Sequence, residues 1–192
     1  MIRSYRKKCR GKGTVAKNAP RRLLIVRPRP ADPRQGLVGF AGRVLPCALG
    51  RSGISARKRE GDGATPLGRL RVLAGYFRQD RLPTARRRGL VLKPISASLG
   101  WCEVPDDRNY NRPVRLPYGA CHERMRRDDD LYDVCLVLDW NIAPRRRGRG
   151  SAIFFHLARK DLSPTAGCVA LRAADMRRLL PQLSREVAMV IG

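Results

Sequence analysis

The chain of 192 residues is 43% hydrophobic and 30% charged, which is enough apolar material for one domain with a buried core. This composition excludes collagen-like and wholly disordered proteins, and no run approaches the roughly 18 apolar residues of a membrane-spanning helix. Lysine and arginine number 41 against 16 aspartate and glutamate, a net charge of +25, which favours anionic partners such as nucleic acid, a membrane surface or an acidic cell-wall polymer.

The first 22 residues are rich in lysine and arginine and show no apolar periodicity. They predict a disordered basic arm over residues 1–22, followed by a single domain over residues 23–192. A secretory signal needs about 7–15 apolar residues after its positive stretch. Because only Leu23–Val26 follow before Arg27 and Pro28, we expect no export signal in this sequence.

Short apolar runs separated by glycine and proline dominate the rest of the chain, which is typical of strands in a mainly β domain. The predicted strands are Leu23–Arg27, Gly36–Phe40, Arg43–Ala48, Gly68–Phe77, Gly89–Leu92, Tyr132–Leu138, Ala152–Leu157, Cys168–Leu171 and Val187–Ile191.

Two segments are expected to be helical. The polar, charged segment Tyr118–Asp130 predicts a short helix. The second, Ala173–Leu183, places apolar residues at i, i+3, i+4 and i+7, which makes one apolar face. The residues of this face are Met176, Leu179, Leu180 and Leu183.

The six cysteines show no CxxC spacing, which excludes a zinc ribbon or a thioredoxin motif, and most of them are expected to be small buried hydrophobic residues, with their disulfide status left open. Cys121, His122 and Glu123 are consecutive, so their side chains diverge and do not close on one ion. We therefore expect no metal and no cofactor. Nucleic acid is also not expected as a partner, because the sequence lacks a recognition helix, zinc-finger spacing and an aromatic platform.

The chain contains two histidines, His122 and His156. Strand alternation places Phe155 on one face and Phe154 with His156 on the other. Cys168 follows 12 residues after His156, directly after Gly167, and a glycine here allows a sharp turn that brings peptide N–H groups near a reacting carbonyl. Two short strands joined by a loop would return Cys168 beside His156, whose imidazolium would lower the pKa of the thiol. The alternative is a buried thiol and a histidine that only packs.

The segment Thr165–Leu171 (TAGCVAL), with the upstream His156, resembles the signature of the L,D-transpeptidase (YkuD-type) catalytic domain, in which a histidine precedes Ser/Thr-His-Gly-Cys. Thr65–Gly68 (TPLG) looks like the Thr-Pro-x-Gly strand entry of that family, and Ala120–Arg127 fits its substrate-side region. These segments follow the family's order between about Glu60 and Met176.

The resemblance implies a YkuD-like β-sandwich or barrel-like domain with a short helix in an inserted segment and a C-terminal helix, acting in the cell envelope. It implies a peptidoglycan L,D-transpeptidase that uses no cofactor and acts on stem peptides. Cys168 would be the nucleophile that forms a thioester and His156 its base, while Gly167 and Thr165 would contribute to the oxyanion and substrate site. The positive surface would favour an anionic cell-wall polymer as a further partner.

Two positions depart from the family signature: Ala166 stands where the motif has a histidine, and Ala170 where arginine or asparagine is frequent. These departures keep a peptidoglycan L,D-carboxypeptidase, endopeptidase or amidase open as alternatives. His122 is a candidate replacement imidazole, the alternative being a surface histidine that pairs with Glu123. A non-catalytic basic module that binds the wall or nucleic acid also stays open, and the sequence does not predict the oligomeric state.

Overall fold

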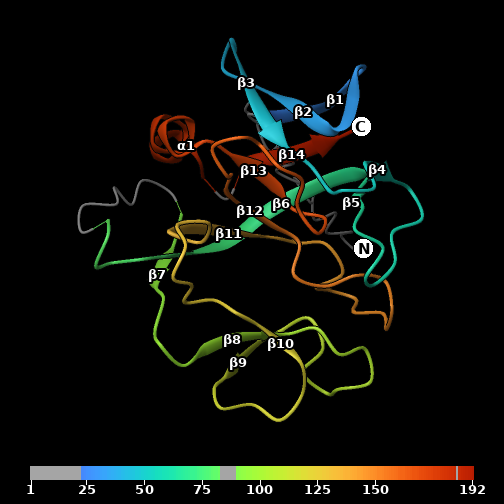
Figure 1. The fold of residues 1–192 in the computed structure, drawn as a ribbon, viewed down its shortest axis with the longest axis vertical. Coiled ribbons are helices and arrows are strands. Elements are labelled where there is room, and N and C mark those ends of the chain that lie inside the picture. Colours follow the sequence, from blue (N-terminus) through green and yellow to red (C-terminus); the bar gives the residue numbers. More distant parts are fainter. Residues whose placement is uncertain (1–22, 83–89, 185) are drawn as a thin grey trace, which may run out of the picture.

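The computed structural model describes residues 23–82, 90–184 and 186–192 (Figure 1). The predicted basic arm, residues 1–22, lies outside the described residues. In the described part the structure is mainly β, as predicted, and its strands form one large sheet and two small ones. No helix in these ranges is long and apolar enough to cross a membrane.

The large sheet has nine described strands in the order β11-β12-β13-β3-β2-β1-β14-β6-β7, and β11 also pairs with β6, so that the sheet closes into a barrel. Because β11 and β6 pair with each other, these two strands leave no exposed edge between them. Its strands are β1 (Leu23–Arg29), β2 (Asp32–Phe40), β3 (Arg43–Ala48), β6 (Gly68–Phe77), β7 (Leu92–Pro94), β11 (Val134–Leu138), β12 (Phe154–Leu157), β13 (Val169–Leu171) and β14 (Ala188–Ile191).

The small sheets are formed by segments between these strands. One pairs β4 (Ile54–Ser55) with β5 (Thr65–Pro66), and the other has the order β10-β8-β9. The strands of the latter are β8 (Leu99–Cys102), β9 (Pro113–Arg115) and β10 (His122–Arg124). Figure 1 shows this three-stranded sheet at the opposite end of the molecule from β1, β2 and β3.

The predicted C-terminal helix is present as α1 (Ala173–Leu179), which continues into a 3₁₀ turn at Leu180–Gln182. Met176 and Leu179 are buried in the main core, as the spacing of its apolar residues predicts. Pro181 has no N–H to donate, which is consistent with the end of the α-helix at this point.

The predicted helix over Tyr118–Asp130 is wrong, because this segment contains turns and the strand β10. Its backbone hydrogen bonds go to β8 rather than along a helix: the Met125 N–H donates to the Leu99 carbonyl at 3.1 Å. The segment has no apolar face at helical spacing, so nothing offsets the cost of helix nucleation. The strand expected at Gly89–Leu92 begins only at Leu92, and residue 89 lies outside the described residues.

The two faces of β12 contact different cores. Phe155 is fully buried with Val169 and Leu171 in the main core inside the barrel. Phe154 faces the other way, where its ring makes an edge contact with that of Trp101 from β8 at a centroid distance of 5.1 Å. The three-stranded sheet is therefore packed against the outer face of β12, and this packing creates the wall of a cavity.

We expect Phe155→Ala to lower the free energy of unfolding by about 3–5 kcal/mol, because the deletion leaves a void in a close-packed core. Val44→Ala is the matched control, since its side chain is 65% exposed and truncation should change stability by less than about 0.5 kcal/mol. Urea unfolding of the three proteins measures both changes. A loss below about 1 kcal/mol in Phe155→Ala would contradict the assignment of this residue to the core.

Candidate active site

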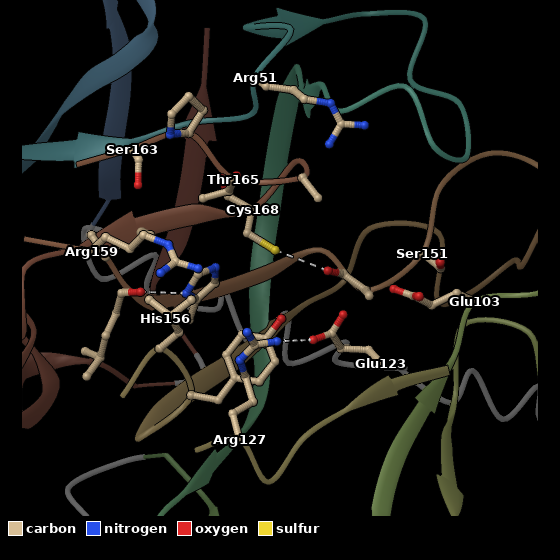
Figure 2. Close-up of a pocket in the computed structure, with 18 of the residues that line it drawn as sticks. Arg51, Glu103, Glu123, Arg127, Ser151, His156, Arg159, Ser163, Thr165 and Cys168 are labelled. Atoms are coloured by element: carbon tan, nitrogen blue, oxygen red, sulfur yellow. Dashed lines mark hydrogen bonds and ion pairs between the residues drawn. The ribbon is translucent and has the colours of Figure 1, made fainter. Parts of the chain in front are cut away.

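A cavity of about 430 Å³ is lined by His156 and Cys168 and lies between β12, β13, the three-stranded sheet and the loop before β5 (Figure 2). The cavity is largely polar, and seven of its lining residues carry a charge: Arg51, Lys58, Glu60, Glu103, Glu123, Arg127 and Arg159. Concave sites with a few converging polar groups are the usual location of chemistry in enzymes.

The register of two parallel strands brings the cysteine and the histidine onto one face. β12 pairs with β13 so that Phe155 is opposite Val169 and His156 is opposite Ala170. Since side chains alternate along a strand, Cys168, two residues before Ala170, lies on the same face as Ala170 and His156. The sequence-based expectation that two neighbouring β elements return Cys168 beside His156 therefore agrees with the observed pairing.

Cys168 is buried, with 7% of its surface exposed. Its Sγ donates to the Ala152 carbonyl at 3.2 Å and accepts the Phe154 N–H at 3.3 Å. Burial raises the pKa of the thiol to about 12, since the thiolate would lose its hydration. Cys168 is therefore a neutral thiol at pH 7.

His156 is 5% exposed, and its ring makes an edge contact with Tyr132 at a centroid distance of 5.2 Å. Burial lowers the pKa of the imidazole to about 4, so the ring is neutral at pH 7. Nδ1 lies 2.8 Å from the Leu157 carbonyl, which only accepts, so Nδ1 carries the proton and Nε2 is the unprotonated nitrogen of the neutral ring. The pair differs from the expected thiolate and imidazolium, because burial disfavours both charged forms.

Thr165 and Gly167 shape the turn in front of Cys168. The Thr165 hydroxyl donates to the Cys168 carbonyl at 2.7 Å and accepts the Gly167 N–H at 3.1 Å. Gly167 has a φ of +136°, and a Cβ there would lie 2.7 Å from the Ala64 carbonyl oxygen, so only glycine fits. Since the Gly167 N–H is already bonded, it is not a free donor, and Thr165 acts on the turn rather than on a ligand.

A second threonine, Thr65, supports the same turn, although the sequence suggested no role for it beyond the strand entry. Its side chain is fully buried and accepts the Gly50 N–H at 2.8 Å, and its hydroxyl lies 3.5 Å from the Cys168 carbonyl. The Arg51 N–H in turn donates to the Thr165 carbonyl at 2.9 Å. The loop that carries Arg51 is thereby attached to the turn of Cys168.

The charged residues of the lining were not predicted, because they come from segments far apart in the sequence. The Arg127 guanidinium donates to Glu123 at 2.8 Å across the cavity wall. Lys58 is 2% exposed and pairs with Asp62. In the sequence, a charged residue in a short polar segment looks the same whether it lines a cavity or lies on an ordinary solvated surface.

His122 is not among the residues that line the cavity. Its Nδ1 lies 2.8 Å from the Ala120 carbonyl, and its ring approaches Tyr118 at a centroid distance of 6.4 Å. Strand alternation in β10 directs Glu123 into the cavity and His122 to the other face. The structure therefore does not bring His122 to Cys168 as a replacement imidazole.

A family model described as the L,D-transpeptidase catalytic domain (YkuD) matches residues 34–191. Among solved structures, L,D-transpeptidase 1 of Mycobacterium tuberculosis is similar, with 12% sequence identity, a TM-score of 0.38, and coverage of 88% of this chain. The match spans 62% of that chain, which is less than two thirds of its length. No curated protein matches the sequence significantly. Because the family model covers the chain from β2 to the end of β14, this protein belongs to the YkuD family of L,D-transpeptidase catalytic domains.

Proposed function

We propose that this protein is a peptidoglycan L,D-transpeptidase that acts by cysteine acyl transfer on stem peptides, with Cys168 as nucleophile and His156 as base. The observation that carries this proposal is the position of both side chains on one face of the paired strands β12 and β13, at the wall of a cavity. The cell envelope is the compartment that this substrate requires. The net charge of +25 would add a salt-sensitive attraction to the anionic wall polymer.

Acylation starts from the neutral pair. The lone pair of His156 Nε2 takes the proton of Cys168 Sγ as the sulfur attacks the carbonyl carbon of the scissile amide. The imidazolium then gives this proton to the leaving nitrogen, so a thioester and a free amine result and His156 is neutral again. The thiolate and the imidazolium form only during the reaction, since burial disfavours both charged forms in the resting enzyme.

The oxyanion of the tetrahedral intermediate needs backbone donors close to the sulfur. The Gly167 N–H is bonded to Thr165, which leaves the N–H of Cys168 itself as the donor offered by this turn. The two threonines bond the Cys168 carbonyl and so restrain the backbone of the residue that carries this N–H. We assign Thr165 and Thr65 as positioning residues for this donor.

An amine or a water molecule then resolves the thioester, and the choice distinguishes a transpeptidase from a hydrolase. Ala166 is exposed and lines the cavity at the position where the family motif has a histidine. This observation favours a second candidate, an L,D-carboxypeptidase or related hydrolase on the same site, because no side chain at this point excludes water. Incubation with purified muropeptides separates the two: cross-linked dimers indicate transpeptidation, and trimmed monomers indicate hydrolysis.

We expect a carbapenem to form a covalent adduct with the wild-type protein, and Cys168→Ala to abolish it without unfolding the protein. Intact-protein mass spectrometry detects the added mass. Cys121→Ser is the matched control, because Cys121 is an exposed free cysteine outside the cavity lining and its variant should be acylated like the wild type. A wild-type protein that forms no adduct, or an adduct that persists in Cys168→Ala, would contradict the nucleophile assignment.

We expect His156→Gln to slow acylation by the carbapenem by roughly 10²–10⁴-fold, the usual contribution of a general base. His122→Gln is the matched control, since His122 lies outside the cavity, and its rate should stay within about twofold of the wild type. Stopped-flow or quenched mass spectrometry measures the rates. Equal losses in both variants, or none in His156→Gln, would exclude His156 as the base.

Stability should depend on pH through His156. Its folded pKa of about 4 lies below the ordinary 6.5, so between these values the unfolded chain binds a proton that the folded protein does not. The free energy of unfolding of the wild type should therefore fall by about 1 kcal/mol more than that of His156→Gln when pH drops from 6 to 5. Urea unfolding at both pH values measures this difference. Identical pH dependence in the two proteins would show that the imidazole is not held neutral by the fold.

A further inference from the structure

A second cavity, of about 190 Å³, lies between the barrel, the three-stranded sheet and the loop after β11, and none of its lining residues lines the cavity of Cys168. We call it the arginine cleft, because two arginines, Arg112 and Arg145, contribute to its lining. The rest of the lining is almost entirely apolar. Its apolar residues include, from the barrel, the three-stranded sheet and the loop, Ala74, Val137, Trp101, Pro113 and Ile142.

The two arginines of the cleft have no counter-ion. No acidic side chain lines the cleft, and neither arginine forms an ion pair with any of the described residues. Arg145 is partly buried: its Nη1 donates to the Tyr110 carbonyl at 3.2 Å, but its Nε is buried without a hydrogen-bond partner in the described part of the chain. Burial and the nearby charge of Arg112 both lower the pKa of Arg145, so two like charges lie close together here.

Arg145 differs in this respect from the other buried or partly buried arginines of the described ranges. Each of those has an acidic partner: Arg78 and Arg126 pair with Asp80, and Arg127 pairs with Asp129. A guanidinium that loses hydration without gaining a counter-ion is costly, and repulsion from a second arginine adds to this cost. An anion that enters the cleft would remove both costs.

The cleft is held in shape by Asn111, which is 2% exposed and lies directly before Arg112. Its Oδ1 accepts the indole N–H of Trp101 at 3.0 Å, and its Nδ2 donates to the Asn141 carbonyl at 2.8 Å. These bonds attach the loop that carries Arg145 to the three-stranded sheet. The two arginines are therefore positioned before any ligand arrives, which lowers the entropic cost of binding.

We propose that the arginine cleft binds a small organic anion that joins a phosphate or carboxylate group to a short apolar portion. The two guanidiniums donate charge-assisted hydrogen bonds to the oxygens of the anion, and the apolar portion packs on Trp101, Val137 and Ile142. The volume is below the roughly 300 Å³ at which sites for drug-sized ligands begin, which limits the apolar portion to about one ring or a short chain. This inference goes beyond the proposed function, because the cleft contains no residue of the proposed acyl transfer.

Phenyl phosphate is the probe, since it combines a phosphate with one aromatic ring, and the indole N–H of Trp101 reports on the cleft by NMR. The chain contains two tryptophans, so the indole signal that remains in a Trp140→Phe variant belongs to Trp101. We expect phenyl phosphate to shift this signal and to bind about tenfold more tightly than inorganic phosphate, because only phenyl phosphate buries an apolar surface. A site-specific signal also excludes general attraction to the positive surface.

Arg112→Gln and Arg145→Gln should each weaken the binding of phenyl phosphate about tenfold, since each removes a charge-assisted hydrogen bond. Arg112 is exposed, so its variant keeps the test valid if Arg145→Gln disturbs the loop. Arg146→Gln is the matched control: it removes the same charge from an exposed neighbour outside the cleft lining, and affinity should change less than about twofold. Ile142→Ala should weaken phenyl phosphate about threefold and leave inorganic phosphate unchanged.

An unshifted Trp101 signal, or equal affinities for phenyl phosphate and inorganic phosphate, would overturn the proposal. Equal losses in Arg112→Gln and Arg146→Gln would also overturn it, because they would reduce the binding to net charge. Phosphatidylglycerol vesicles distinguish two sources of the anion. Vesicle binding that falls in Arg112→Gln but not in Arg146→Gln assigns a lipid headgroup, and equal vesicle binding by both variants assigns a soluble acid.

Discussion

The parallel pairing of β12 with β13 is the constraint on which the site depends. Because His156 is opposite Ala170, the alternation of the two strands directs His156 and Cys168 to the same face. A shift of the register by one residue would turn one of these side chains into the barrel core, where Phe155 and Val169 now pack. The buried residues on the inner face therefore fix the position of His156 and Cys168 on the outer face.

The same burial determines the chemistry of the pair. A thiol and an imidazole enclosed by Phe154, Tyr132 and the three-stranded sheet are both more stable as neutral groups. The hydrogen bond from Nδ1 to the Leu157 carbonyl leaves Nε2 as the basic atom. In the proposed mechanism, proton transfer occurs only at the moment of attack. The neutral, buried thiol is expected to resist adventitious oxidation, which follows thiolate character and exposure.

Local patterns were sufficient to predict several parts of this structure. Short apolar runs separated by glycine and proline predicted the strands of the barrel, and the spacing of Met176 and Leu179 predicted α1. The Thr-x-Gly-Cys sequence with the upstream His156 indicated two residues that the structure places in the lining of one cavity. The helix over Tyr118–Asp130 was wrong because its polar residues carry no periodicity, and the structure pairs this segment with β8 instead. Glu103 and Arg51 could not be predicted, since they reach the cavity only through tertiary packing of distant segments.

Nitrogen NMR of the imidazole rings would show whether His156 is a neutral base beside a neutral Cys168 thiol. The chain contains two histidines, so the ring signals that disappear in a His122→Gln variant belong to His122 and those that remain belong to His156. At pH 7 we expect a neutral His156 ring with its proton on Nδ1 and an unprotonated Nε2, a state that persists down to about pH 5. A His156 imidazolium at pH 7, or a ring with its proton on Nε2, would show that the fold does not hold a neutral base with an unprotonated Nε2 beside Cys168.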